Sequence, residues 1–400
     1  MKRNRDDLGQ DRIRIRENAD QVSELHKREL KHSKGFSPLV ILAVIWIVLV
    51  FFSMFFVVAY DPRYFVPAYY FEQVTLNIRN FYNFVFSAGN SGNIGITLYK
   101  LIGIALTGAA LASCGSVMQG SYRNVMAGPS TTGTMAGGTL GCILYILLFE
   151  DAATTSLSFL STYAMQLCIL AGCLAGTGLI LIISRIAGRG RLSPSAMLIA
   201  GMVFSHVISS VNMVIQYYMI VTNPNDTRIE NIRDMMMGSF DRIDSPLTLL
   251  MMGVPLVICF VIMMVIRGKL NLLSMGDDEA MASGLNVQRY RLMMMLLGSV
   301  MTALTMAFCG RVGFVGFMTP LITRKITGPD MKRIVPCSIL TGAILLTVIY
   351  DLAVLFNMTD SINVFTSVIG CVLMVITLFR KGGDRDAPFK GRGAMHMGMR

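Results

Sequence analysis

One stretch of the sequence carries polar side chains that could bind a solute on an otherwise apolar helix. It runs from Ser193 to Val221 and holds Gly201, Ser205, Ser209, Asn212 and Gln216. At 100° per residue these five fall within an arc of roughly 80°, so they share one helix face. In a bilayer such a face turns to the protein interior or to a wet cavity. The stripe therefore predicts either hydrogen bonding between helices or a substrate pathway, and the sequence leaves both open.

A second stretch, from Gly276 to Asn286, is acidic and rich in small residues. Its members are Gly276, Asp277, Asp278, Glu279, Ala280 and Gly284. Carboxylates are favourable in the first turn of a helix because the helix dipole is positive there. The simplest interpretation is an ordinary helix start.

The elements that position both stretches must lie in a membrane. Of the 400 residues, 54% are hydrophobic and 15% are charged, which is too apolar for a soluble chain of this length. A spanning helix needs about 20 apolar residues, and ten stretches approach that length. They are residues 38–59, 95–122, 129–149, 159–184, 194–221, 246–267, 289–309, 311–326, 334–356 and 362–379. We therefore expect an all-α membrane protein with about ten transmembrane helices.

Lys and Arg near the ends of these stretches predict the orientation. The first thirty-six residues hold ten of them, and Arg185, Arg267, Lys325 and Arg380 fall on the same side if the spans alternate. By the positive-inside rule, both termini are cytoplasmic. The net charge of +11 follows from this asymmetry, so we expect no nucleic-acid partner.

The domain organisation that follows is simple. We expect a cytoplasmic tail over residues 1–36, one membrane domain over 37–380 and a second cytoplasmic tail over 381–400. Small residues recur at every fourth position at Gly133, Gly137 and Gly141, and again at Gly172 and Gly176, which favours close helix packing in lipid. The 8 cysteines show no CxxC or Cys/His spacing, so we expect no metal site.

Four blocks of residues resemble the permeases of iron-siderophore, haem and vitamin B12 ABC importers. The first is Gly108-Ala-Ala-Leu followed by Gln119, Arg123, Asn124 and Pro129. The second is Leu192-Ser193-Pro194, followed by Met237-Gly238-Ser239. The third is Leu270-Asn271-Leu272-Leu273 with Gly276 to Ala280 and Gly284. The fourth holds Gly313, Gly316, Pro320 and Arg324, followed by Gly328, Pro329 and Asp330. The blocks stand in the family's order and cover roughly Ile94 to Arg380.

The resemblance implies the subunit composition and the place of the protein. It implies a ten-helix subunit of the bacterial inner membrane, paired with a sister permease or a second copy. Two cytoplasmic ABC ATPases lie below it, and an extracytoplasmic substrate-binding protein lies above. The Gly276 to Asn286 segment would form two short helices docked in a groove of the ATPase.

Nucleotide must then be bound by a partner. The chain has no GxxxxGK[ST] phosphate loop, so we expect it to be no enzyme and to bind no cofactor itself, with ATP and Mg on the ATPase. It would form the translocation pathway for an iron chelate or a cobalamin-like compound.

Departures from the family pattern cluster at the expected outer face. Thr97 and Leu355 stand where the family has Arg, and Lys100 is the cation that remains near Thr97. Either the binding protein has changed its docking surface to match, or a sister permease supplies the missing cations, and the second explanation requires a heterodimer. The alternatives from other classes are a secondary transporter or channel and a non-transporting subunit that keeps the fold. The spans carry few deep charges and show no clear repeat, which disfavours the secondary transporter.

Overall fold

The computed structural model describes residues 38–57, 67–86, 94–149, 158–222 and 227–381, and these are helical with no strand. The helices that correspond to the predicted spans are α2 (Pro38–Phe52) with its π-helical end η1 (Ser53–Val57), α4 (Ile94–Tyr122), α5 (Thr134–Phe149), α6 (Ser158–Ala187), α7 (Pro194–Thr222), α9 (Pro246–Met275), α11 (Val287–Cys309), α12 (Val315–Thr327), α13 (Met331–Leu355) and α14 (Ile362–Lys381). The all-α fold class is thus confirmed.

The number of helices long enough to cross a membrane is smaller than ten. Eight of the described helices meet the requirements of length and apolar composition, and the apolar helix at Thr134–Leu148 is shorter. Helix α12 has 13 residues, about 20 Å of rise, against a hydrocarbon core of about 30 Å. The predicted 311–326 span is shortened because α12 begins only at Val315, after left-handed backbone at Gly310 and Phe314.

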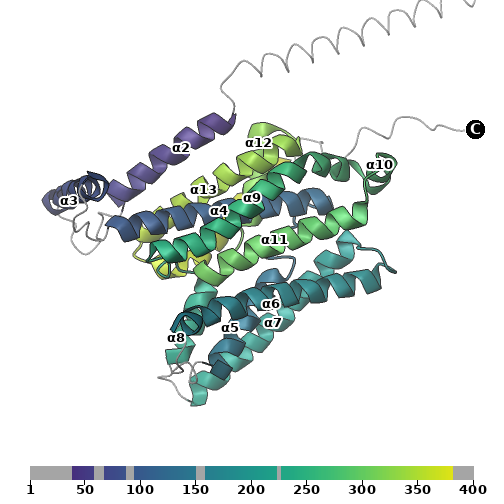
Figure 1. Ribbon diagram of the computed structural model, residues 1–400, viewed down its shortest axis with the longest axis horizontal. Helices are drawn as coiled ribbons and strands as arrows, with labels where there is room; N and C mark the ends of the chain where they lie inside the picture. Colours follow the sequence, from purple (N-terminus) through teal and green to yellow (C-terminus); the bar gives the residue numbers. More distant parts are fainter. Residues whose placement is uncertain (1–37, 58–66, 87–93, 150–157, 223–226, 382–400) are drawn as a thin grey trace, which may run out of the picture.

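Four further segments are short or amphipathic. They are α3 (Pro67–Phe86), α8 (Thr227–Met237), α10 (Asp277–Ala282) and the 3₁₀ turn η2 (Thr359–Ser361). Figure 1 shows α10 at one end of the bundle and α3 with α8 at the other. We call these the α10 end and the opposite end. The predicted tails, residues 1–36 and 382–400, lie outside the described residues.

Helix α4 is the centre of the bundle. In its apolar window 89% of the residues are buried, and it packs against α9, α11, α12 and α13. Figure 1 shows α4, α9, α11 and α13 running side by side. Glycines allow this density: a Cβ at Gly115 would lie 1.5 Å from the Gly316 carbonyl oxygen of α12. The helix backbones meet where the side chains are smallest.

The second tight pair is α5 with α6. A Cβ at Gly137 would lie 2.3 Å from the Gly172 carbonyl oxygen, and a Cβ at Gly141 would meet the Cys168 carbonyl oxygen at the same distance. The close packing predicted from the spacing of these glycines is confirmed. Helix α11 contacts both α4 and α6, so it joins this pair to the central group.

Helix α2 lies at the edge of the bundle and is anchored by one buried polar contact. Only 22% of the residues in its apolar window are buried. The Ser53 hydroxyl, in the π-helical turn, donates to the Asp351 carboxylate of α13 at 2.5 Å. Asp351 is 8% exposed, so this bond satisfies a carboxyl group that would otherwise be costly to bury.

Candidate functional site

Helix α10 and the start of α11 form a rigid corner at the end of α9. The Leu285 N–H donates to the Ala280 carbonyl, and the Gly284 N–H donates to that of Met281. This is a Schellman arrangement, which needs a left-handed residue, and Gly284 has φ +79°. Two residues later the Asn286 side chain accepts from the Arg289 N–H at 3.1 Å and caps α11. The corner therefore fixes α10 relative to α11.

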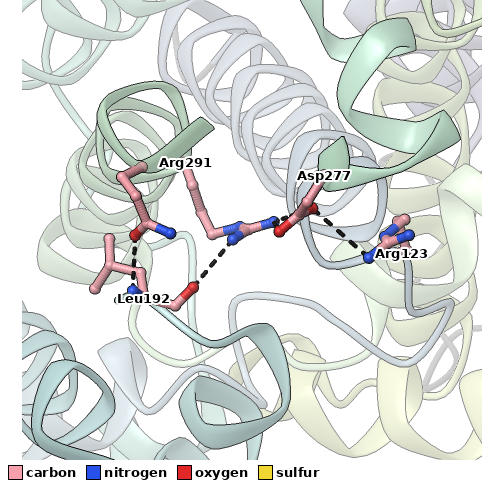
Figure 2. Close-up of polar contacts among 5 residues, drawn as sticks. Arg123, Leu192, Asp277 and Arg291 are labelled. Atoms are coloured by element: carbon pink, nitrogen blue, oxygen red, sulfur yellow. Dashed lines mark hydrogen bonds and ion pairs between the residues drawn. The ribbon is translucent and has the colours of Figure 1, made fainter. Parts of the chain in front are cut away.

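An ion pair between a buried arginine and a half-buried aspartate ties this corner to the rest of the bundle. Arg291, on α11, is 1% exposed and donates from Nη2 to both carboxylate oxygens of Asp277, at 2.9 and 3.1 Å. Its Nη1 donates to the Leu192 carbonyl at 3.0 Å, and the Leu192 N–H donates to the Gln288 side chain at 2.7 Å. Arg123, at the end of α4, lies 3.6 Å from Asp277. Figure 2 shows these contacts, and we call the five residues the latch.

The latch joins elements that are far apart in the sequence. Asp277 comes from α10, Arg123 follows α4, and Leu192 lies in the connection between α6 and α7. The Arg291 guanidinium uses Nη2 for the Asp277 carboxylate and Nη1 for the Leu192 carbonyl, and hydrogen bonds to ionised groups are stronger than neutral ones. The latch therefore connects α10 to the end of α4 and to the α6–α7 connection.

Sequence reasoning named Asp277 and Arg123 but missed Arg291 and Gln288. The available signal was an arginine on the apolar face of a helix: Tyr290, Arg291, Met294 and Met295 are all buried. A cation in such a row requires a partner, because a buried charge is tolerated only when paired.

The acidic segment is one short helix and not the two that the resemblance implied. The second expected helix is absent because residues 283–286 form the turn that leads directly into α11. In α10 the side chains of Asp278 and Glu279 are exposed, whereas Ala280 is buried against the bundle. Gly276 is the extended residue between α9 and α10.

The motif residues after α4 build the junction with α12. Gln119 is fully buried and donates from Nε2 to the Phe317 carbonyl at 3.0 Å. The Asn124 side chain accepts from the Met126 N–H at 2.8 Å and closes the turn that follows α4. Pro129 packs against Gly316, at which a Cβ would lie 2.7 Å from the proline ring. These residues thus hold α4 against α12.

The remaining motif residues lie along and before α12. The Gly313 N–H donates to the Asn363 side chain at 2.9 Å, which attaches the start of α12 to α14. Pro320 is buried inside α12, and Arg324 lies in its last turn, at the α10 end. These are structural positions in the fold, and they do not converge on a single cavity with the latch.

A reciprocal amide–carboxylate contact joins α9 to α13 beside the latch. Asn271 donates from Nδ2 to Asp330 at 2.6 Å and accepts from the Met331 N–H at 2.7 Å. Partial burial acts to raise the pKa of Asp330, but the Asn271 amide, the Lys332 N–H and the nearby cations Arg333 and Lys332 outweigh it and hold the pKa below the ordinary 3.8. Both residues belong to the resembling blocks.

The polar stripe of α7 faces the protein. Asn212 is buried, and Ser205, Ser209 and Gln216 are half-buried. Gln216 donates to the sulfur of Met236 on α8 at 3.1 Å. The opposite face of α7 is exposed and apolar or aromatic, as at Val214 and Tyr217. The pathway assignment of the four polar residues stays a prediction.

At the opposite end, Lys100 is paired. Its ammonium group contacts Asp241, which also accepts from the Ser239 hydroxyl at 2.9 Å. Partial burial acts to raise the pKa of Asp241, yet the contacts with Lys100 hold it below its ordinary value. Thr97 is in the same helix, and Leu355 is exposed at the end of α13. The remaining cation named in the sequence is therefore neutralised locally.

Among the described residues, no group of three or more His, Cys, Asp or Glu side chains is placed to hold a metal ion. The eight helices long and apolar enough to cross a membrane are typical of a multi-pass membrane protein. Helix α10, an exposed acidic helix, lies at one end and is bonded to the helices behind it. The chain belongs to the FecCD transport family, whose model matches residues 63–380. It is thus a transport permease of the ABC importer class and not a catalytic subunit.

Individual relatives cover most of the membrane domain. An ABC transporter permease protein of Methanocaldococcus jannaschii is 29% identical over 71% of this chain and 80% of its own length. The iron-uptake system permease protein FeuB of Bacillus subtilis is 28% identical over 72% of this chain and 81% of its own. A solved metal-chelate type ABC transporter in an inward-facing conformation has a TM-score of 0.68 at 22% identity, covering 86% of this chain and 98% of that one. This last likeness shows the fold.

Proposed function

We propose that this chain forms half of the translocation pathway of an ATP-driven importer for an iron chelate, such as a siderophore or haem, or for a cobalamin-like compound. The observation that carries the proposal is α10, whose exposed Asp278 and Glu279 lie at the end of the bundle while Asp277 is bonded to Arg291. Family membership supports ATP-driven import as the type of transport, and the iron-uptake relative supports an iron chelate as the substrate.

The proposed partners are those that membership in the ABC importer class implies. The α10 end faces the cytoplasm of a bacterial cell, where two ABC ATPases carry ATP and Mg and bind α10. A second permease, either a sister or another copy, completes the pathway, and a substrate-binding protein docks at the opposite end. ATPase motion enters through α10 and reaches α4 and the α6–α7 connection through the latch.

A charge reversal on α10 tests the coupling. The variant Glu279→Lys with Gly284→Val changes an exposed carboxylate and strains the left-handed turn, at which no neighbouring atom lies within 4 Å. The matched control is Glu230→Lys, an exposed carboxylate of α8 at the opposite end, away from the proposed ATPase contact. In proteoliposomes with the ATPase, we expect uptake of a radiolabelled ferric siderophore to fall at least about tenfold in the α10 variant. The control should keep wild-type co-purification of the ATPase.

Co-purification of the ATPase is measured on the same samples. The α10 variant should insert at the wild-type level and lose its ATPase, because the altered surface is the proposed contact. Wild-type yield and activity of the ATPase with the α10 variant would contradict the coupling role. Uptake that persists without ATP would indicate a secondary transporter, and ATPase binding without uptake of any chelate would indicate a non-transporting subunit.

A further inference from the structure

A crevice of about 380 Å³ opens between the end of α6 and the start of α11, beside the latch. Its lining includes two arginines, Arg185 on α6 and Arg289 on α11. Its apolar wall is made by Leu181, Ile182 and Leu292. One crevice thus offers two cations beside a hydrocarbon surface, which is the combination that an amphiphilic anion needs.

The two cations are available to a ligand. Both residues are exposed, and no side-chain hydrogen bond or ion pair joins either guanidinium to another residue within the described ranges. Like charges held near each other without a counter-ion repel, so an anion between them would relieve that repulsion. Guanidinium groups suit phosphate because their N–H donors match its oxygens in pairs.

The position of the crevice selects the kind of anion. Helix α6 is a candidate membrane span from Tyr163 to Ala187, so the crevice lies at its last turns, where a span leaves the hydrocarbon layer. Immediately beside it, α6 exposes Leu179, Ile183 and Ile186, of which Ile186 is 73% exposed. Basic pockets between membrane helices at this depth suit anionic lipid headgroups. A free phosphate would use the cations and leave the apolar wall without a function.

We propose that this crevice binds the headgroup of an anionic phospholipid, with its phosphate between Arg185 and Arg289 and an acyl chain along Leu181, Ile182 and Leu292. The site lies in the cytoplasmic leaflet if the α10 end is cytoplasmic, as in the proposed function. Binding of the lipid does not depend on that orientation. Leu192 and Gln288 line this crevice and also belong to the latch. A bound headgroup therefore stabilises the α6–α7 connection that Arg291 holds.

Native mass spectrometry tests the binding. The protein is released from nanodiscs of equal parts phosphatidylglycerol and phosphatidylcholine, and the two kinds of lipid adduct are compared. Wild type should retain phosphatidylglycerol preferentially. The variant Arg185→Gln with Arg289→Gln should reduce that preference about tenfold, since each cation near the surface contributes to the attraction. The control, Lys269→Gln with Lys325→Gln, removes two exposed cations of the same end from outside the crevice and should keep the preference.

Hydrogen–deuterium exchange locates the lipid. Phosphatidylglycerol should slow amide exchange over residues 186–193 relative to phosphatidylcholine alone, and the double arginine variant should abolish the difference. Equal lipid preference in wild type and the arginine variant would overturn the proposal. So would equal loss in the lysine control, which would indicate a general surface charge effect. Displacement of the lipid by millimolar inorganic phosphate would also overturn it, because the crevice would then be a site for free anions. None of these readouts depends on transport.

Discussion

At the scale of single residues, the latch depends on one buried guanidinium group. Arg291 is 1% exposed, and a charge in that position is tolerated only because Asp277 and the Leu192 carbonyl accept its hydrogen bonds. Asp277 and Asp278 are adjacent in sequence and have different roles. The first is half-buried and pairs with the buried Arg291, and the second is exposed on α10.

Replacing Asp277 should therefore destabilise the protein. Asp277→Ala leaves the buried Arg291 without a counter-ion, which costs several kcal/mol in a closed interior. Because the Asp277 side chain is 31% exposed, water screens part of this, and we expect a loss of about 2 kcal/mol in the free energy of unfolding in detergent. Chemical denaturation measures it.

Two further variants separate the loss of the ion pair from the effect of a surface substitution. Asp278→Ala should change stability by less than about 0.5 kcal/mol, as a surface substitution does. Adding Arg291→Met to Asp277→Ala should restore part of the loss, because the unpaired charge is then gone. Equal losses for Asp277→Ala and Asp278→Ala would show that the ion pair does not hold α10.

The charge of Asp330 predicts a pH dependence. Its folded pKa lies below the ordinary 3.8, so the stability it contributes is present above that pH and is lost as pH falls through the folded value. Asp330→Asn keeps a capping side chain and removes the charge. The variant should be less stable than wild type near pH 6, and the difference should vanish near pH 2 in thermal unfolding. A difference that stays constant with pH would assign the contribution to the hydrogen bonds alone.

At the scale of helices, contacts between backbones decide which pairs form. Gly115 of α4 lies against Gly316 of α12, and Gly137 of α5 lies against Gly172 of α6. In lipid, the gain from such contacts is van der Waals packing, since apolar side chains are solvated equally well by acyl chains. A single methyl group at these points therefore separates two helices.

A pair of glycine substitutions tests this packing. Gly115→Ala would place its Cβ 1.5 Å from the Gly316 carbonyl oxygen, so α4 and α12 must move apart, at a cost of about 2 to 3 kcal/mol. Gly178→Ala in α6 meets no atom within 4 Å and should be neutral or slightly stabilising. The midpoint of thermal unfolding compares the two. Equal midpoints would mean that the α4–α12 contact is loose.

At the scale of the whole molecule, the faces of α7 bear on the substrate pathway. The polar stripe faces the rest of this chain, whereas the exposed face is apolar or aromatic. The side-chain oxygens of Ser205 and Asn212 have no hydrogen-bond partner among the described residues. Hydrogen bonds between helices therefore do not satisfy every polar group of the stripe. Such buried, unpaired oxygens are costly unless water reaches them.

Thiol labelling measures whether the stripe is wet. In a background lacking the exposed Cys371, we expect Ser205→Cys, Ser209→Cys and Gln216→Cys to react with a water-soluble thiol reagent. Asn212→Cys should react more slowly, because Asn212 is 1% exposed. The control is Ser210→Cys, which lies on the exposed face beside the stripe and should be protected by lipid. Protection at all four stripe positions would favour simple packing.

The sequence by itself determined the class of this protein. Long apolar stretches must become helices in lipid, because no water is available to pair with backbone groups, and this requirement is local to each stretch. The glycine spacing at Gly137 and Gly172 likewise predicted a close helix pair, since period and size are visible in the sequence. The four ordered motif blocks were sufficient for the family.

The latch and the lengths of the helices were decided only by the tertiary structure. Arg291 pairs with Asp277, fourteen residues away, and with Leu192, ninety-nine residues away, and such pairing depends on how α6, α10 and α11 pack. Left-handed backbone at Gly284 and Phe314 set the single α10 helix and the late start of α12. The hydrophobicity of a segment is the sum over its own residues, so it locates a membrane helix from the sequence alone. The partners of a buried charge come from other segments, and they are brought together only by folding.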